Sequence, residues 1–310
     1  MTTRPYRVRG ETRRSGARLL VARLALGLAM LAAAASPAPA KPFRPAALAP
    51  PPPGALPPAV QQIDDTERAF AQAVAQSGIA AGFRQYAAPD AVMFLPDPVS
   101  ATAELAGARW PGELLWRAQY IGVAPSGDLA FSAGPSLLRG SGRPSGGFYV
   151  TIWKRQADGG WKFVLDQGAD MPPSIFSALG RPLEVLNADP PPGPASNEGM
   201  READGALNVA LPSRGAMAFA ERLDDQAILV RANRPVAQGR RRAQALASDT
   251  PPILEAFTLG GSRSMDGAFG YTYGRARWSG PAGPHTGYYV RVWRATPQGW
   301  RLLADQLAER

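Results

Sequence analysis

The sequence of 310 residues contains no cysteine and a single histidine, His285. Without cysteine the chain forms no disulfide, offers no thiol nucleophile, has no thiolate ligand for a metal and has no cysteine for lipid attachment. One histidine cannot build a histidine-rich zinc site or a facial triad of metal ligands. No glycine-rich phosphate loop follows a predicted strand, because the glycine-rich stretch 140–147 lies in a predicted hairpin. We therefore expect neither a metal nor a cofactor.

Acidic residues are outnumbered by lysine and arginine, 25 to 34, but most of this excess lies in the first 40 residues. That segment holds 7 basic residues and 1 acidic residue, so the remainder carries a net charge of 27 − 24 = +3. A charge this small removes the main reason to expect nucleic-acid binding. One basic cluster remains, Arg240-Arg241-Arg242, which is either a contact for an anionic partner or a solvated loop or helix end.

Residues 1–40 have the features of an export signal. Arginines precede an apolar run at 19–35, and the segment ends in Ala38-Pro39-Ala40, a small-x-small cleavage pattern. We expect cleavage before Lys41 and a periplasmic or secreted protein, exported by the Sec or the twin-arginine route. An uncleaved membrane anchor is the alternative, but Arg23 interrupts the run and leaves a short apolar core. We therefore expect no stable membrane anchor.

The C-terminal third of the chain repeats a pattern from its middle. The segments GFYVTIWK at 147–154 and WKFVLDQ at 161–167 reappear as GYYVRVWR at 287–294 and WRLLADQ at 300–306. The offset, 287 − 147 = 140 residues, is far longer than the period of a solenoid or propeller, so each copy should be a complete domain. The expected organisation is a signal peptide 1–40, a proline-rich spacer 41–61, a first domain 62–170, a proline-rich linker 171–199 and a second, divergent domain 200–310.

Hydrophobic periodicity places helices first and strands after them, an α+β pattern. Asp64 or Asp65 is expected to cap the first helix, a second helix at 79–87 stops before Pro89, and Pro89-Asp90 favours a turn. Reversal signals between the strands predict an antiparallel meander. The expected strands are 91–95, 114–123, 128–138, 148–155 and 161–167 in the first copy, and 227–230, 253–260, 267–278, 288–294 and 300–305 in the second, with further short helices at 100–108 and 175–186.

This order of elements carries three recognisable segments, APDAV at 88–92, SGDLAFSAGP at 126–135 and YVTIWKR to VLDQ at 149–167. Together they resemble the nuclear transport factor 2-like superfamily, in particular its uncharacterised bacterial domains related to polyketide cyclases and ketosteroid isomerase. The resemblance covers 62–170 and, more weakly, 200–308. It implies two cystatin-like α+β cone domains, each with a curved antiparallel sheet wrapped over N-terminal helices and a conical pocket. Relatives include isomerases, cyclases, dehydratases and non-catalytic binding domains, so the fold does not imply a chemistry.

Acid-base chemistry in such a cone needs a carboxyl group in a dry pocket, and in ketosteroid isomerase an aspartate base acts beside a tyrosine and a protonated aspartate. The resemblance therefore makes Asp90, Asp166 and Tyr86 the catalytic candidates, with Tyr149 as a second donor. Asp90 is alternatively a turn-initiating or capping carboxylate. Asp166 lies on a partly polar strand face, which suits either a wet pocket rim or an exposed surface.

The candidates for ligand contact are Trp116, Arg117, Tyr149, Trp153 and Asp305. Trp116-Arg117 offers a cation beside an indole for an anionic ligand, although an arginine at a strand edge is often only solvated. Tyr149 and Trp153 lie on one face of an alternating strand, which either packs as core or lines a cavity. Asp305 occupies the place of Asp166, and the repeated Asp-Gln pair also suits a structural role.

The interpretation we favour is an exported tandem module that binds a small apolar molecule or a protein partner without catalysis, and we lean against an enzyme. The rival is a cofactor-independent lyase or isomerase with an aspartate base in the cone of the first domain. That reading requires one of the candidate carboxyls to face a closed cavity with a raised pKa. A third interpretation is that the two copies pair through their sheets within the chain, which an apolar outer face on both sheets would support.

Overall fold

The computed structural model describes residues 56–140, 142–186, 199–280 and 283–310. The expected signal peptide, the spacer up to residue 55 and linker residues 187–198 lie outside the described residues. Within the described ranges, no helix is both long enough and apolar enough to cross a membrane. We call residues 56–186 the first copy and residues 199–310 the second copy.

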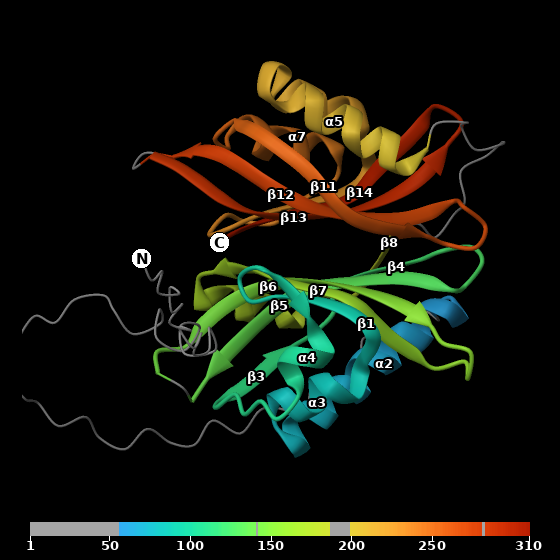
Figure 1. Ribbon diagram of the computed structural model, residues 1–310, viewed down its shortest axis with the longest axis vertical. Helices are drawn as coiled ribbons and strands as arrows, with labels where there is room; N and C mark the ends of the chain where they lie inside the picture. The colour runs from blue at the N-terminus through green and yellow to red at the C-terminus, as the bar shows by residue number, and fades with distance from the viewer. Residues whose placement is uncertain (1–55, 141, 187–198, 281–282) are drawn as a thin grey trace, which may run out of the picture. The chain divides into compact units, whose positions relative to one another are not determined.

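The first copy consists of an eight-stranded sheet with its N-terminal helices packed on one face (Figure 1). The strand order is β2-β1-β7-β6-β5-β4-β8, and β3 also pairs with β5. The β1–β7 and β4–β8 pairs are parallel, and the others are antiparallel. The elements are α2 (Pro58–Ser77), α3 (Ile79–Tyr86), β1 (Ala87–Phe94), β2 (Pro98–Ser100), α4 (Ala101–Leu105), β3 (Glu113–Trp116), β4 (Tyr120–Val123), β5 (Leu129–Arg139), β6 (Ser145–Arg155), β7 (Trp161–Met171), the 3-10 helix η1 (Pro173–Gly180) and β8 (Glu184–Leu186).

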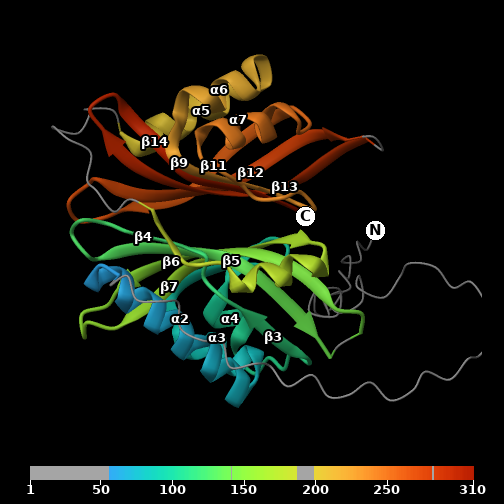
Figure 2. The same ribbon diagram turned by 180° about the vertical axis from the view of Figure 1, so that it is seen from behind.

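The second copy repeats this plan with a six-stranded sheet in the order β10-β9-β14-β13-β12-β11. Its helices again cover one face of the sheet (Figure 2). The elements are α5 (Met200–Arg214), α6 (Ala216–Arg222), β9 (Leu223–Arg231), β10 (Ala237–Gln238), α7 (Arg240–Ser248), β11 (Ile253–Arg263), β12 (Phe269–Gly280), β13 (Gly283–Thr296) and β14 (Gly299–Glu309). The expected α+β class with two sheets, each preceded by helices, is confirmed.

The first helix begins earlier than its capping signal predicted. It starts at Pro58, because proline is well accommodated in the first turn of a helix, where its missing N–H is not needed. Asp64 therefore lies inside α2 rather than at its cap. The helical period then places Ile63, Glu67 and Phe70 on the buried face toward the sheet. This shift brings a carboxyl group into the interior of the first copy.

The chain also departs from the predicted strands near residues 89 and 118. Pro89 and Asp90 lie within β1 rather than in a turn, at the point where its pairing with β7 is interrupted and no ladder hydrogen bond is needed. The expected strand 114–123 is divided into β3 and β4 by a bulge opposite Gly134, where a Cβ atom would lie 2.0 Å from the Arg117 carbonyl oxygen. The expected helix 175–186 is the 3-10 helix η1 followed by β8.

Hydrogen bonds and ring contacts connect the two copies. Phe131 and Phe269 stack with ring centroids 6.3 Å apart, inside one continuous cluster of buried apolar residues that draws on both sheets. Gln306 Nε2 donates to the Gln167 carbonyl oxygen at 2.9 Å, and Gln167 Nε2 donates to the Tyr288 carbonyl oxygen at 3.1 Å. The repeated glutamines of the two Asp-Gln pairs therefore contact each other, whereas each aspartate bonds within its own copy.

Candidate functional site

Each copy carries an acidic residue on the buried face of its first helix. Glu67 on α2 and Asp204 on α5 lie the same distance before the glycine that ends the helix, since 78 − 67 = 215 − 204 = 11. Both side chains are almost fully buried, 3% and 0% exposed. The first helix of each copy therefore buries an acidic side chain to a similar extent. The residues around each acid determine its chemical behaviour.

In the first copy Glu67 is held by neutral donors. Trp116 Nε1 donates to Glu67 Oε2 at 2.7 Å, the Ser132 hydroxyl donates to Oε1, and Trp153 Nε1 donates to Ser132 Oγ at 2.8 Å. Burial raises the pKa of Glu67 to about 7, and the charge of Asp166 acts in the same direction, although the hydrogen bonds from Ser132 and Trp116 oppose the shift. In the described part of the chain Glu67 forms no ion pair.

Asp166 and Tyr149 lie on the same side of the sheet as Glu67. Thr151 Oγ1 donates to Asp166 Oδ2 at 2.6 Å, and burial raises the pKa of Asp166 to about 6. Burial also raises the pKa of the Tyr149 hydroxyl well above its usual value, and the charges of Glu67 and Asp166 add to this. That hydroxyl has no hydrogen-bond partner among the described residues. The Asp166 side chain is still partly exposed to solvent. Glu67 is therefore the carboxyl group that is better shielded from water.

Aromatic side chains fill the interior around Glu67. Phe70 lies at the centre, with ring centroids between 4.8 and 6.1 Å from those of five other aromatic residues, Phe83, Tyr86, Trp116, Trp153 and Phe163. Contacts of this kind are typical of a packed core. The first copy therefore combines three ionisable groups, Glu67, Asp166 and Tyr149, with tightly packed surroundings.

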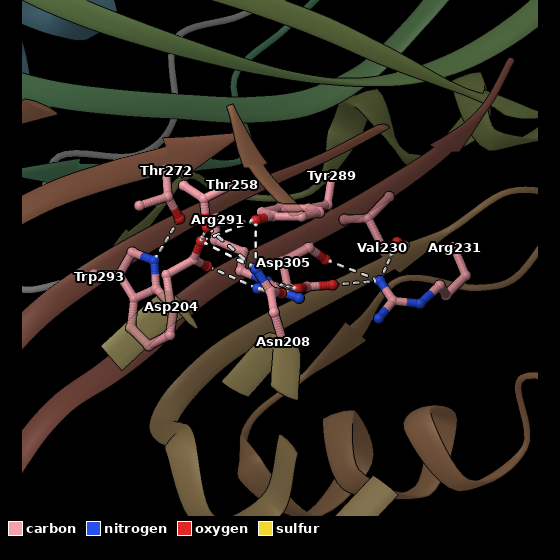
Figure 3. A network of polar contacts seen from close by, with 10 residues as sticks. All are labelled: Asp204, Asn208, Val230, Arg231, Thr258, Thr272, Tyr289, Arg291, Trp293 and Asp305. Carbon is pink, nitrogen blue, oxygen red and sulfur yellow. Dashed lines mark hydrogen bonds and ion pairs between the residues drawn. The ribbon is translucent and has the colours of Figure 1, made fainter. Parts of the chain in front are cut away.

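The second copy replaces Thr151 with Arg291, since 291 − 151 = 140 (Figure 3). The side chain is fully buried, and its Nη1 donates to Asp204 Oδ1 and Asn208 Oδ1, both at 2.7 Å. Its Nε donates to Asp305 Oδ2 at 2.8 Å. The Tyr289 hydroxyl adds a bond to Asp204 Oδ2 at 2.8 Å. Asp204 and Asp305 are thus joined by one guanidinium group.

Arg231 extends this network. Its Nη1 lies 2.6 Å from Asp305 Oδ1 and donates to the Val230 carbonyl oxygen at 2.8 Å. Burial alone would raise the pKa of Asp305, but the charges of Arg231 and Arg291 outweigh it and hold that pKa below its usual value. Asp305 is therefore an ionised, paired carboxylate.

A cavity of about 430 Å³ opens beside Arg231 in the second copy. It lies where the ends of β9 and β14 meet the start of β11, the α5–α6 junction and α7. Most of the side chains that form its wall are apolar, among them Leu211, Phe219, Ile253, Trp278 and Leu307. The Arg231 guanidinium carbon is 5.5 Å from the Phe219 ring centroid, and that of Arg291 is 5.9 Å from it. Phe219, which lines the cavity, thus lies close to both arginines.

The structure brings some of the sequence candidates together and separates others. Trp116, Tyr149, Trp153 and Asp166 surround the Glu67 interior. Tyr86 ends α3 and packs on Phe70 at the edge of this interior, with ring centroids 4.9 Å apart.

Three other candidates lie elsewhere. Asp90 is exposed on β1, where it lines a second hollow of about 470 Å³ with Leu259 and Tyr273. Arg117 is half-buried in the bulge between β3 and β4. Asp305 belongs to the ion network of the second copy. The roles assigned to all these residues stay predictions.

Sequence reasoning missed Glu67, Asp204, Arg231 and Arg291. A signal existed for two of them. Glu67 follows Ile63 by four residues and precedes Phe70 by three, which places it on the apolar helix face. Arg291 interrupts a repeated strand at a position where the first copy has threonine.

Comparisons with protein-family models and with curated proteins find no match. Among solved structures, the chain is similar to an NTF2-like protein with a cystatin-like fold from Novosphingobium aromaticivorans (17% identity, 36% of this chain and 80% of that chain, TM-score 0.30). It is also similar to an NTF-2 like protein of unknown function from Shewanella oneidensis (15%, 36% and 98%, 0.31) and to an uncharacterised protein with a cystatin-like fold from Caulobacter vibrioides (12%, 36% and 87%, 0.30). Each similarity covers about a third of the chain, and we base no functional conclusion on it.

Proposed function

We propose that this chain is an exported, non-catalytic module that binds a small, largely apolar molecule in the cavity of its second copy. The observation that carries the proposal is the cavity itself, whose volume of about 430 Å³ lies in the range of small-molecule sites and whose wall combines apolar side chains with polar groups. Such sites usually combine an apolar body with a few polar groups that orient the ligand. Here Arg231 is a buried polar group of that wall.

The electrostatics of the second copy favour binding over proton transfer. A general base acts best when its pKa is close to the working pH. The arginines hold the pKa of Asp305 below its usual range, and Asp204 shares Arg291 with it. Asp305 is therefore not poised to exchange a proton with a ligand near neutral pH.

Native mass spectrometry of residues 41–310 purified from the exporting cell tests the proposal. We expect a retained mass that is lost in Ala247→Trp, because Ala247 lines the cavity and an indole would fill it. Ala245→Trp is the matched control, since Ala245 is exposed on the same helix. A small molecule retained equally by both variants would place its site elsewhere and contradict the proposal.

Export is part of this proposal and has its own test. The arginine-rich start, the apolar run and the Ala38-Pro39-Ala40 pattern support it. N-terminal sequencing of the protein recovered outside the cytoplasm should begin at Lys41. Recovery of the chain with Met1 intact in the cytoplasm alone would contradict export.

The second candidate function is a cofactor-independent lyase or isomerase in the first copy, and the clustered Glu67, Asp166 and Tyr149 favour it. Burial raises the pKa of Glu67 to about 7 and that of Asp166 to about 6, a range suited to general acid-base catalysis. In this reading Asp166 removes a proton and Tyr149 donates one. Deuterium exchange into cyclohexanone in D₂O, followed by NMR, should then be faster with the native chain than with Asp166→Asn. Equal rates would count against an enzyme.

A further inference from the structure

We propose that the molecule bound in the second copy carries a carboxylate, and that Arg231 binds this group through the edge of its guanidinium that faces the cavity. The inference rests on the proposed function, since it assigns a chemical class to the ligand of the same cavity. Three observations carry it: the free edge of Arg231, the order of charges behind it, and the composition of the wall.

Arg231 uses only one of its three nitrogens to bind protein. Its contacts with the Val230 carbonyl, the Asp305 carbonyl and the Asp305 carboxylate all involve Nη1. A guanidinium has five N–H groups, so the Nε hydrogen and both Nη2 hydrogens have no partner among the described residues. Figure 3 shows the Nε–Nη2 edge turned away from Asp305. The residue is only 6% exposed and lines the cavity, so these donors are available chiefly to a molecule bound there.

The ionic side chains behind the cavity alternate in sign. Arg231 is followed by Asp305, then Arg291, then Asp204. The four charges sum to zero, but Arg231 is the member that lines the cavity. Neither aspartate lines it. At the other end, the Tyr289 and Thr258 hydroxyls donate to Asp204. The end of the network that meets a ligand is therefore positive.

The remaining wall limits the ligand to one acidic group on an apolar body. Glu309 and Arg234 also line the cavity, but each contacts a side chain that does not line it: Glu309 Oε1 lies 2.5 Å from His285 Nδ1, and Arg234 forms an ion pair with Asp249. Arg231 is the buried guanidinium of this wall, and its Nε–Nη2 edge has free donors. Two parallel N–H groups match the two oxygens of a carboxylate, a bidentate geometry in which arginine excels. An aryl or alicyclic monocarboxylate fits this arrangement.

The test compares two probes of nearly equal shape, 3-phenylpropionate and 3-phenylpropionamide, by isothermal titration calorimetry with residues 41–310 at pH 7. We expect the carboxylate to bind on the order of tenfold more tightly, since hydrogen bonds to charged groups are worth more than neutral ones. Arg231→Gln should abolish this preference. Arg263→Gln, at an exposed arginine outside this wall, should keep it.

Binding of the neutral fluorophore N-phenyl-1-naphthylamine separates the two proposals. If the fluorophore binds and is displaced equally well by both probes, the carboxylate assignment is wrong and the cavity remains a binding site. If the fluorophore and both probes fail to bind, the proposed function fails, and this inference fails with it. The probe preference is measured first on the native chain, so the inference stays falsifiable even if Arg231→Gln does not fold.

Discussion

Arg291 and Thr151 occupy equivalent strand positions, and each faces an aspartate on the next strand, Asp305 or Asp166. A threonine hydroxyl satisfies one carboxylate oxygen but brings no charge. Arg291 compensates the charges of Asp204 and Asp305 and turns them into ion-pair partners. A single side chain therefore decides whether the interior of a copy holds protonatable acids or a fixed ionic network.

Glu67→Gln should flatten the pH dependence of stability. The pKa of Glu67 rises from 4.5 to about 7 on folding, so between these values the folded state binds more protons than the unfolded state. The free energy of unfolding of the native chain should therefore fall as pH rises through this window, by a Glu67 contribution of about 3 kcal/mol. Urea unfolding at pH 5 and pH 8 measures it. Equal pH slopes for the native chain and the variant would contradict the assignment.

Arg291→Thr should recreate the first-copy arrangement in the second copy at a large cost. It leaves Asp204 and Asp305 buried without their shared cation, which typically costs about 3–5 kcal/mol. The loss should be smaller at pH 5 than at pH 8, because uncompensated buried carboxyls take up protons. Denaturant unfolding at both pH values tests this. Arg263→Thr, at an exposed arginine, is the control, with an expected change within about 0.5 kcal/mol.

At the scale of single elements, two glycines allow backbone conformation to be compared without a difference in packing: Gly78, which ends α2, and Gly205, which lies inside α5. A Cβ atom at either Gly78 or Gly205 would meet no atom within 4 Å, so the two sites differ only in backbone conformation. Gly78 has φ of 88° and ψ of 163°, a region open almost only to glycine, whereas Gly205 is inside α5.

Gly205→Ala should therefore stabilise the chain by about 0.5–1 kcal/mol. Gly78→Ala should destabilise it by about 1–3 kcal/mol. Thermal unfolding followed by circular dichroism compares both variants with the native chain. Changes of the same sign would show that packing, and not the backbone, governs these helix positions.

Strands were easier to foresee than the site they support. Alternation in 148–155 and 288–294 is strong because one face packs on helices and the other joins the buried cluster shared by both sheets. Pro89-Asp90 gave a turn signal from local preference, but pairing with β7 on both sides of this dipeptide, at Ala87 and Val92, keeps the chain extended. Local signals fail where a partner strand decides the conformation.

The interior polar residues show the same limit. Glu67 was readable from helical spacing, because its neighbours on that face are apolar. Arg231 was not, because its role depends on Asp305, which is 74 residues away in sequence and meets it only through the parallel pairing of β9 with β14. Asp90 was a catalytic candidate, with a turn or capping role as the alternative, and it is exposed. A motif predicts a local conformation, whereas burial depends on the whole fold.

At the scale of the whole molecule, we propose that the two copies stabilise each other through their sheets. A double-mutant cycle with Phe131→Leu and Phe269→Leu tests this, because these rings stack and both are fully buried. We expect a coupling energy of about 0.5–1.5 kcal/mol in denaturant unfolding. Phe131→Leu combined with Leu246→Ala, on the helical side of the second copy, should be additive. Additive losses in the first pair would argue against mutual stabilisation.

The single histidine gives the molecule a built-in reporter. The His285 ring stacks on Trp278 at a centroid distance of 6.0 Å, and Trp278 lines the cavity of the second copy. One imidazole in the chain means that its ring protons give NMR resonances that need no assignment by mutagenesis. The lack of cysteine means that one introduced thiol can carry a spin label or fluorophore at a chosen place, with no native thiol to remove. Occupancy of the cavity can thus be followed in solution on the otherwise unaltered chain.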